Sequence, residues 1–156
     1  MNARWLALPL CAALLAGAAA RASEQAVSDF GPGVTNAYQA RTDYQLKCQG
    51  CHRPDGSGDD HSNPPMHGIV AKFLTVPGGR EFIGRVPGVA TVDLPDDRLA
   101  NLVNWTLFQF DREHVPAGFR PYTADEIGRL RQSPLRLERA ATRARLVAGF
   151  AKTTAE

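Results

Sequence analysis

Cys48-Gln49-Gly50-Cys51-His52 is the stretch of this sequence that determines the fold. Two cysteines separated by two residues and followed at once by a histidine form the C-x-x-C-H pattern of covalent heme attachment. In that arrangement both thiols add to the vinyl groups of the porphyrin, and the histidine can offer its Nε2 atom to the iron. The motif therefore predicts one covalently bound heme c on Cys48 and Cys51, with His52 as an axial iron ligand.

Three other kinds of site could use the same cysteines. A structural disulfide would have no need of His52, and a thioredoxin-like redox pair would need a βαβ pattern, which the sequence lacks. A zinc site normally needs four ligands, and there is no second cysteine pair. Heme attachment is the interpretation that uses every residue of the motif.

The segments beside the motif resemble the class I cytochrome c family. Tyr44 lies in a segment of helical composition, residues 35–47, and a glycine-rich turn at residues 53–58 follows His52. Residues 96–110 give the clearest predicted helix. The apolar stripe of this helix consists of Leu99, Leu102, Val103, Leu107 and Phe110. The resemblance implies an all-α, cytochrome c-like small helical domain around one heme, and it covers about half of the chain.

The resemblance also implies two contacts. In the family the first helix crosses a late helix that carries an aromatic residue, and Trp105 takes this place, with Ala40 and Tyr44 as its partners. The family also places a proline after the glycine-rich turn, and the carbonyl of that proline accepts a hydrogen bond from Nδ1 of the heme histidine. Pro64 is therefore expected to fix the tautomer of His52 and to raise its basicity.

The sixth iron ligand is missing from its usual place. Electron-transferring members of the family supply a methionine from the loop before the last helix, but residues 85–93 contain no methionine, histidine or lysine. Val89 lies nearest to the expected position. Apart from the first residue the one methionine is Met66, just past the predicted proximal proline. Two interpretations stay open: Met66 ligates the iron, or Met66 packs against the porphyrin and leaves the iron five-coordinate.

Four further polar residues are candidates for the heme site. His61 and His67 are weaker candidates for an iron ligand than the methionine. Arg80 or Arg85 could pair with a heme propionate, because a guanidinium group matches a carboxylate with two parallel hydrogen bonds. Any of the four side chains could equally lie exposed in a loop.

Residues 1–22 are typical of a secretory signal peptide. Arg4 precedes an apolar run at residues 5–20, and small residues surround a cleavage site before Ser23. The run is shorter than the ~20 residues of a membrane-spanning helix. An uncleaved anchor and lipid attachment at Cys11 are the less favoured alternatives. We therefore expect a periplasmic protein with no stable membrane insertion after cleavage.

The remaining chain divides into two parts. Residues 23–110 are the predicted heme domain, and residues 111–156 form a helical C-terminal extension. One helix of the extension opens at Thr123, with Glu126 three residues later in a capping-box pattern. Another helix, over residues 135–151, is arginine-rich and amphipathic. The extension either wraps the domain or meets a partner, and its composition does not choose between these.

The charge balance limits the partners. The chain has 18 Lys and Arg and 16 Asp and Glu residues, and two of the basic residues lie in the predicted signal peptide, so the remainder is formally neutral. This excludes a global basic field for nucleic acid. We expect redox partner proteins instead, with single electrons passing from a periplasmic dehydrogenase to a terminal acceptor. The alternatives are a five-coordinate heme protein that binds a small ligand or reacts with peroxide, and a permanent cytochrome subunit of a dehydrogenase complex. No catalytic residues are apparent.

Overall fold

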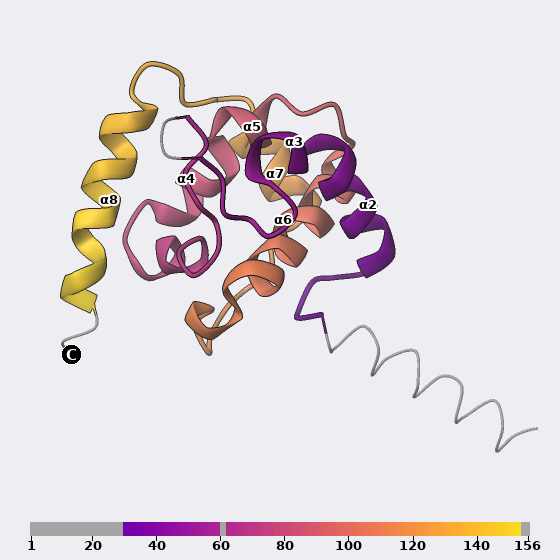
Figure 1. Ribbon diagram of the computed structural model, residues 1–156, viewed down its shortest axis with the longest axis horizontal. Helices are drawn as coiled ribbons and strands as arrows, with labels where there is room; N and C mark the ends of the chain where they lie inside the picture. Colours follow the sequence, from indigo (N-terminus) through magenta and orange to yellow (C-terminus); the bar gives the residue numbers. More distant parts are fainter. Residues whose placement is uncertain (1–29, 60–61, 154–156) are drawn as a thin grey trace, which may run out of the picture.

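The computed structural model describes residues 30–59 and 62–153, which form helices and connecting loops without any strand (Figure 1). The elements in chain order are α2 (Ala37–Lys47), α3 (Gln49–His52), the 3-10 turn η1 (Ala71–Thr75), α4 (Gly79–Arg85), α5 (Pro87–Ala90), α6 (Asp96–Asp111), the 3-10 turn η2 (Arg112–His114), α7 (Ala124–Leu130) and α8 (Arg139–Thr153). The prediction of an all-α fold is confirmed. The predicted signal peptide and His61 lie outside the described residues.

The two longest helices before the C-terminal segment, α2 and α6, pack across each other. The side chain of Asn36 accepts a hydrogen bond from the Gln39 amide at 2.9 Å and so caps the start of α2. Tyr44 of α2 lies with its ring centroid 5.6 Å from that of Trp105 and 5.0 Å from that of Phe110, both on α6. The predicted aromatic crossing of these helices is therefore confirmed.

Buried polar side chains fix the same crossing. Asp43 of α2 is only 1% exposed and forms an ion pair with Arg98 of α6. Asn104 of α6 is also 1% exposed; its Oδ1 accepts from the Tyr122 amide at 2.8 Å and its Nδ2 donates to the Tyr122 carbonyl at 3.0 Å. Because buried polar groups are costly without partners, these pairings specify how α2 and the chain before α7 lie on α6.

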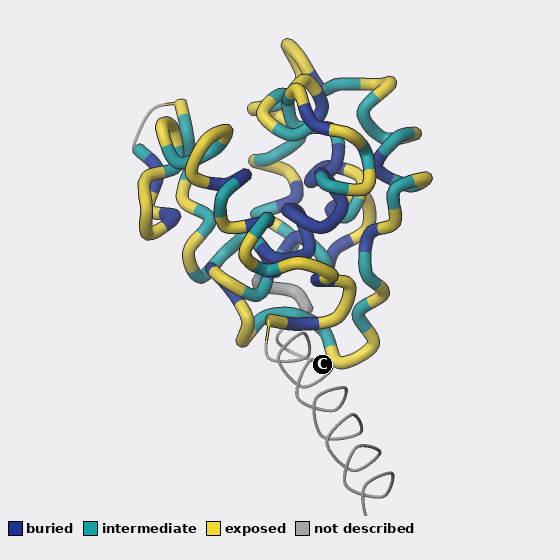
Figure 2. The backbone as a smooth tube through the Cα atoms, turned by 90° about the vertical axis from the view of Figure 1, so that its right-hand side faces the viewer, coloured by how far each residue is buried: buried dark blue, intermediate teal, exposed yellow. Residues whose placement is uncertain are grey.

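The segment that follows α6 belongs to the same core. Ile127 of α7 is fully buried, as is Leu107 of α6, and many of the buried residues gather in the interior of the molecule (Figure 2). The Thr123 hydroxyl accepts from the Glu126 amide at 3.2 Å, which is half of the predicted capping box. The Glu126 carboxylate does not complete the box, because it is bound to Arg80 instead.

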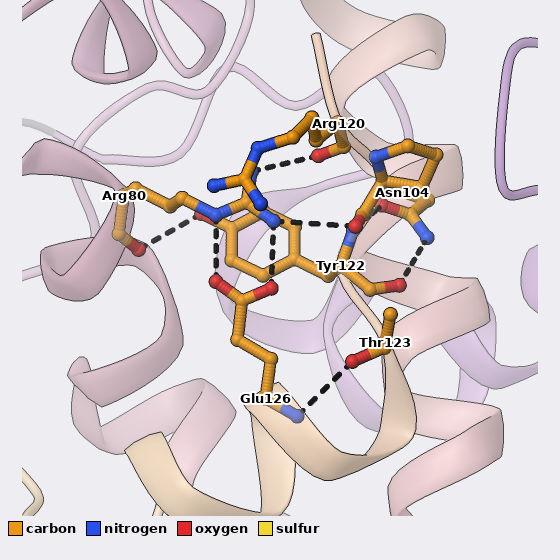
Figure 3. A network of polar contacts seen from close by, with 7 residues as sticks. Arg80, Asn104, Arg120, Tyr122, Thr123 and Glu126 are labelled. Carbon is orange, nitrogen blue, oxygen red and sulfur yellow. Dashed lines mark hydrogen bonds and ion pairs between the residues drawn. The ribbon is translucent and has the colours of Figure 1, made fainter.

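Arg80 joins α4 to α7 (Figure 3). Its guanidinium donates to both carboxylate oxygens of Glu126, at 2.6 and 2.7 Å, and to the Arg120 carbonyl at 2.8 Å. It also lies 4.0 Å from the ring centroid of Tyr122, whose hydroxyl donates to the Arg80 carbonyl at 2.8 Å. Arg80 is therefore a structural cation, and the heme-propionate role considered for it does not fit its position.

The Arg80–Glu126 pair predicts a pH dependence of stability. Hydrogen bonding to Arg80 lowers the pKa of Glu126 below its ordinary value of 4.5. The pair's contribution to the free energy of unfolding is therefore full above that value and is lost as the pH falls through the lowered pKa. We expect Glu126→Gln to flatten the decline of stability as the pH falls below 4.5. Denaturant unfolding over this range measures the effect, with the exposed Glu81→Gln as control; equal slopes in both variants would contradict it.

The last helix, α8, packs along one flank of the molecule beside η1 and α4 (Figure 1). Leu146 of α8 is 3% exposed, and the Phe150 ring lies 5.0 Å from that of Phe73 in η1. The C-terminal extension was expected either to wrap the domain or to meet a partner. Helix α8 of the extension packs against the domain. No helix in the described parts of the chain is long and apolar enough to cross a membrane.

Candidate heme-binding site

A cavity of about 660 Å³ lies between the helices of the fold. It is bounded by α2, α3, the loop that follows α3, η1, α4, α5, α6 and α8. Its apolar lining includes Val70, Phe73, Phe82, Ile83, Val86, Val89, Val92, Leu99, Leu102, Val103 and Leu107. The size and the apolar walls are typical of a site for an organic cofactor.

The side chains of the predicted attachment motif lie at this cavity. Cys48, Cys51 and His52 all line it. The amides of Cys51 and His52 donate to the Cys48 carbonyl at 3.1 and 2.9 Å, so a single helical turn brings both thiols and the imidazole to one wall. Cys48 is half-buried and Cys51 is exposed, and both are free thiols. The structure thus brings together the three residues that the sequence singled out.

The Cys48 thiol does not have the character of a redox-active thiol. Burial, with smaller contributions from Asp43 and Cys51, raises the pKa of Cys48 to about 11. Catalytic dithiol pairs have a cysteine whose pKa is lowered. The environment of Cys48 therefore disfavours the thioredoxin-like interpretation.

His52 is held in a state suited to metal ligation. Its Nδ1 atom is buried and, among the described residues, has no hydrogen-bond partner. Burial lowers the pKa of His52, while the Asp59 carboxylate and the Pro64 carbonyl act in the raising direction. The Pro64 carbonyl is thus near the imidazole, as the family resemblance implies, although its contact falls short of hydrogen-bond geometry. A neutral imidazole with an acceptor close to one nitrogen fits an iron ligand at the other.

The glycine-rich turn carries Pro64 and Met66 to the cavity. The Gly58 amide donates to the His52 carbonyl at 3.1 Å. Gly58 has φ +64°, and a Cβ there would lie 2.0 Å from the Asn63 carbonyl oxygen, so only glycine fits this close return of the chain. The Met66 amide donates to the Gly56 carbonyl at 2.8 Å. Met66 and Pro64 therefore belong to the loop that leaves His52.

Another wall of the cavity has no iron-binding atom. It is formed by Val86, Pro87, Gly88, Val89 and Val92. Of the other candidate ligands, Met66 lines the cavity and packs against the core, whereas His67 does not line it.

The arginines at the cavity are not those that the sequence suggested. Arg85 donates through Nε to the Ser133 carbonyl at 2.7 Å, and neither it nor Arg80 lines the cavity. Arg139 and Arg143 of α8 do line it. The only sequence signal for them is their spacing of one helical turn in an arginine-rich helix, which does not reveal what the helix faces.

The motif, the apolar cavity and the unpartnered imidazole nitrogen together fit a porphyrin attached through thioethers. No protein-family model matches the chain, and no solved structure matches it significantly. The chain is 30% identical over 107 residues to cytochrome c-552 of Thermus thermophilus, an alignment that covers 57% of this chain and 82% of that protein. It is also 30% identical to a second cytochrome c-552 from the same species, of which 72% is covered. The chain belongs to the class I c-type cytochromes, the family of heme c-containing electron carriers.

Proposed function

We propose that this chain carries single electrons on one heme that is covalently attached through Cys48 and Cys51 and ligated by His52. The observation that carries the proposal is the meeting of these three side chains at one apolar cavity in a member of the cytochrome c family. When bound, the iron porphyrin supplies a one-electron ferric/ferrous couple. Every other part of the function depends on how the chain holds and surrounds that group.

The packed walls of the cavity limit how far the surrounding dipoles and solvent rearrange when the iron gains or loses an electron. Phe73 and Phe82 stack with centroids 4.9 Å apart, and Leu99 is 1% exposed, so close packing surrounds the site. Such walls exclude water and leave few dipoles free to reorient. The Pro64 carbonyl would orient His52 by accepting from Nδ1. The exposed position of Cys51 leaves one edge of the site near the surface for electron exchange.

We also propose a location and partners for this electron carrier. We place the carrier in the periplasm because residues 1–22 have the pattern of a secretory signal, and because covalent attachment keeps a cofactor from dissociating outside the cell. There it would accept electrons from a dehydrogenase and pass them to a respiratory acceptor, either as a mobile carrier or as a fixed subunit. Co-purification of the native protein with a dehydrogenase would distinguish the fixed subunit.

A second candidate function is the binding of a small neutral ligand at a five-coordinate iron. It is favoured by the wall at residues 86–92, which has no iron-binding atom, and by the tie of the Met66 backbone to Gly56 in the loop that leaves His52. In that case Met66 is a packing residue, and the site would bind carbon monoxide or nitric oxide or react with peroxide.

Carbon monoxide separates the two candidates. For an electron carrier with Met66 as the sixth ligand, we expect the spectrum of the reduced protein to be unchanged by carbon monoxide. Met66→Leu, which conserves volume, should then bind it readily. Ile69→Leu in the same loop does not line the cavity and is the matched control. Carbon monoxide binding by the wild type as readily as by Met66→Leu would instead support the second function and count against Met66 as a ligand.

A further inference from the structure

Helix α8 presents one face to the cavity. Arg139, Ala140, Arg143 and Ala144 line the cavity and lie at i, i+1, i+4 and i+5 along the helix. The two alanines leave space beside the cavity, whereas the two arginines bring positive charge to it. This face of α8 therefore adds two charged side chains to a cavity lining that is otherwise mostly apolar.

Packing away from the arginines determines the position of α8. Leu146 is buried, and a Cβ at Gly149 would lie 3.2 Å from the Val76 side chain, so the helix approaches the end of η1 closely. Phe150 meets Phe73 edge-on. At the N-terminal end of α8, Arg139 donates to the Ser62 carbonyl at 3.3 Å. The helix is therefore held at both ends, and its cavity face is fixed.

Arg143 is a partly buried cation without a described counter-ion. Its guanidinium lies 5.9 Å from the ring centroid of Phe73, and burial lowers its pKa. It takes part in none of the ion pairs found within residues 30–59 and 62–150. A partly buried charge is costly unless an anion accompanies it, so Arg143 at the edge of a cavity calls for an anionic group inside that cavity.

The other charged side chains at the cavity also favour an anionic ligand. Lys47, Arg139 and Arg143 bring three cations, and Asp59 brings a carboxylate. Asp59 is already used in its loop, where it accepts from the Ser62 amide and the Asn63 side-chain amide, both at 2.6 Å. The lining is therefore suited to an apolar ligand that carries carboxylates on one edge.

We propose that α8 is a cationic cap on the cavity, in which Arg139 and Arg143 pair with the propionate carboxylates of the heme. The inference rests on the proposed function, since the pairing requires heme in this cavity. A guanidinium matches a carboxylate in charge and in geometry. Reduction of the iron adds a negative charge to the site, so nearby cations favour the reduced state. The cap therefore raises the midpoint potential of the cytochrome.

The test is the midpoint potential of the full-length holoprotein with single charges removed from α8. We expect Arg143→Gln to lower the equilibrium constant for reduction about fivefold, or about 40 mV at 59 mV per tenfold change. Adding Arg139→Gln should bring the effect to roughly tenfold. Arg143→Lys keeps the charge and should restore most of the potential, which loss of packing alone would not predict. Arg145→Gln, exposed on the same helix and outside the cavity lining, is the matched control and should change the constant less than twofold.

The outcomes separate this inference from the proposed function. Heme content per chain and helical circular dichroism establish that each variant is folded and loaded; if Arg143→Gln does not load, Arg139→Gln and Arg143→Lys make the comparison. Loaded variants at Arg139 and Arg143 with the potential of Arg145→Gln would overturn the cap while leaving the electron carrier intact. A wild-type protein without heme would overturn the proposed function itself.

Discussion

Replacement of Cys48 and Cys51 together by serine is expected to give a colourless protein that retains essentially no heme after denaturation. The two thiols line one wall of the cavity with His52, and no other described cysteine is available to form a thioether. His52 alone would hold the cofactor only by coordination, which denaturation breaks. Heme absorbance and in-gel heme staining after expression in a host with cytochrome c maturation measure the effect.

The matched control for this prediction is Cys11→Ser. It removes a cysteine from the predicted signal peptide and should leave heme content unchanged. Covalent heme that survives in the double serine variant would show that the cofactor is attached elsewhere. Loss of heme in both variants would point to failure of export rather than to loss of the attachment site.

Gly79→Ala is expected to destabilise the protein by about 3 kcal/mol, at the upper end of the usual cost of overpacking. A Cβ at Gly79 would lie 1.8 Å from the carbonyl oxygen of Phe73 and 2.7 Å from its carbonyl carbon. The backbone cannot turn aside as a flexible side chain could, so α4 must move away from η1. Thermal unfolding should show a Tm lower by roughly 10 °C.

The same substitution also disturbs the heme site. Phe73 of η1 and Phe82 of α4 stack on each other and both line the cavity, so separating the two elements opens its wall. Gly118→Ala is the control, because a Cβ there meets nothing within 4 Å, and we expect a change within about 0.5 kcal/mol. A Gly79→Ala protein as stable as this control would mean that α4 and η1 are not packed as described.

Local sequence signals predicted the framework well. The helix expected over residues 96–110 is α6, Asp96–Asp111, and the helix expected over residues 35–47 begins at Ala37 after the Asn36 cap. The predicted attachment motif needed no long-range information, because Cys48, Cys51 and His52 lie on one helical turn. Periodicity and capping are properties of neighbouring residues, so a single sequence contains them.

Contacts between distant residues could not be predicted in the same way. Arg80 lies 46 residues before Glu126, and Arg139 lies 77 residues after Ser62. Nothing local distinguishes an arginine that meets a glutamate of α7 from one that faces a heme cavity. The sequence therefore offered Arg80 and Arg85 as propionate partners. It predicted a helix over residues 135–151, which is α8, but not that Arg139 and Arg143 line the cavity, because that depends on where the last helix returns to the fold.

The proposed function depends on one heme that is joined to Cys48 and Cys51 in this cavity. Its most direct test is the intact mass of the purified protein under denaturing conditions, followed by mass mapping of the peptide that contains residues 48–52. We expect a chain heavier by the mass of one heme, with the whole increment on that peptide. A chain of unmodified mass, purified from a host that matures other c-type cytochromes, would contradict it.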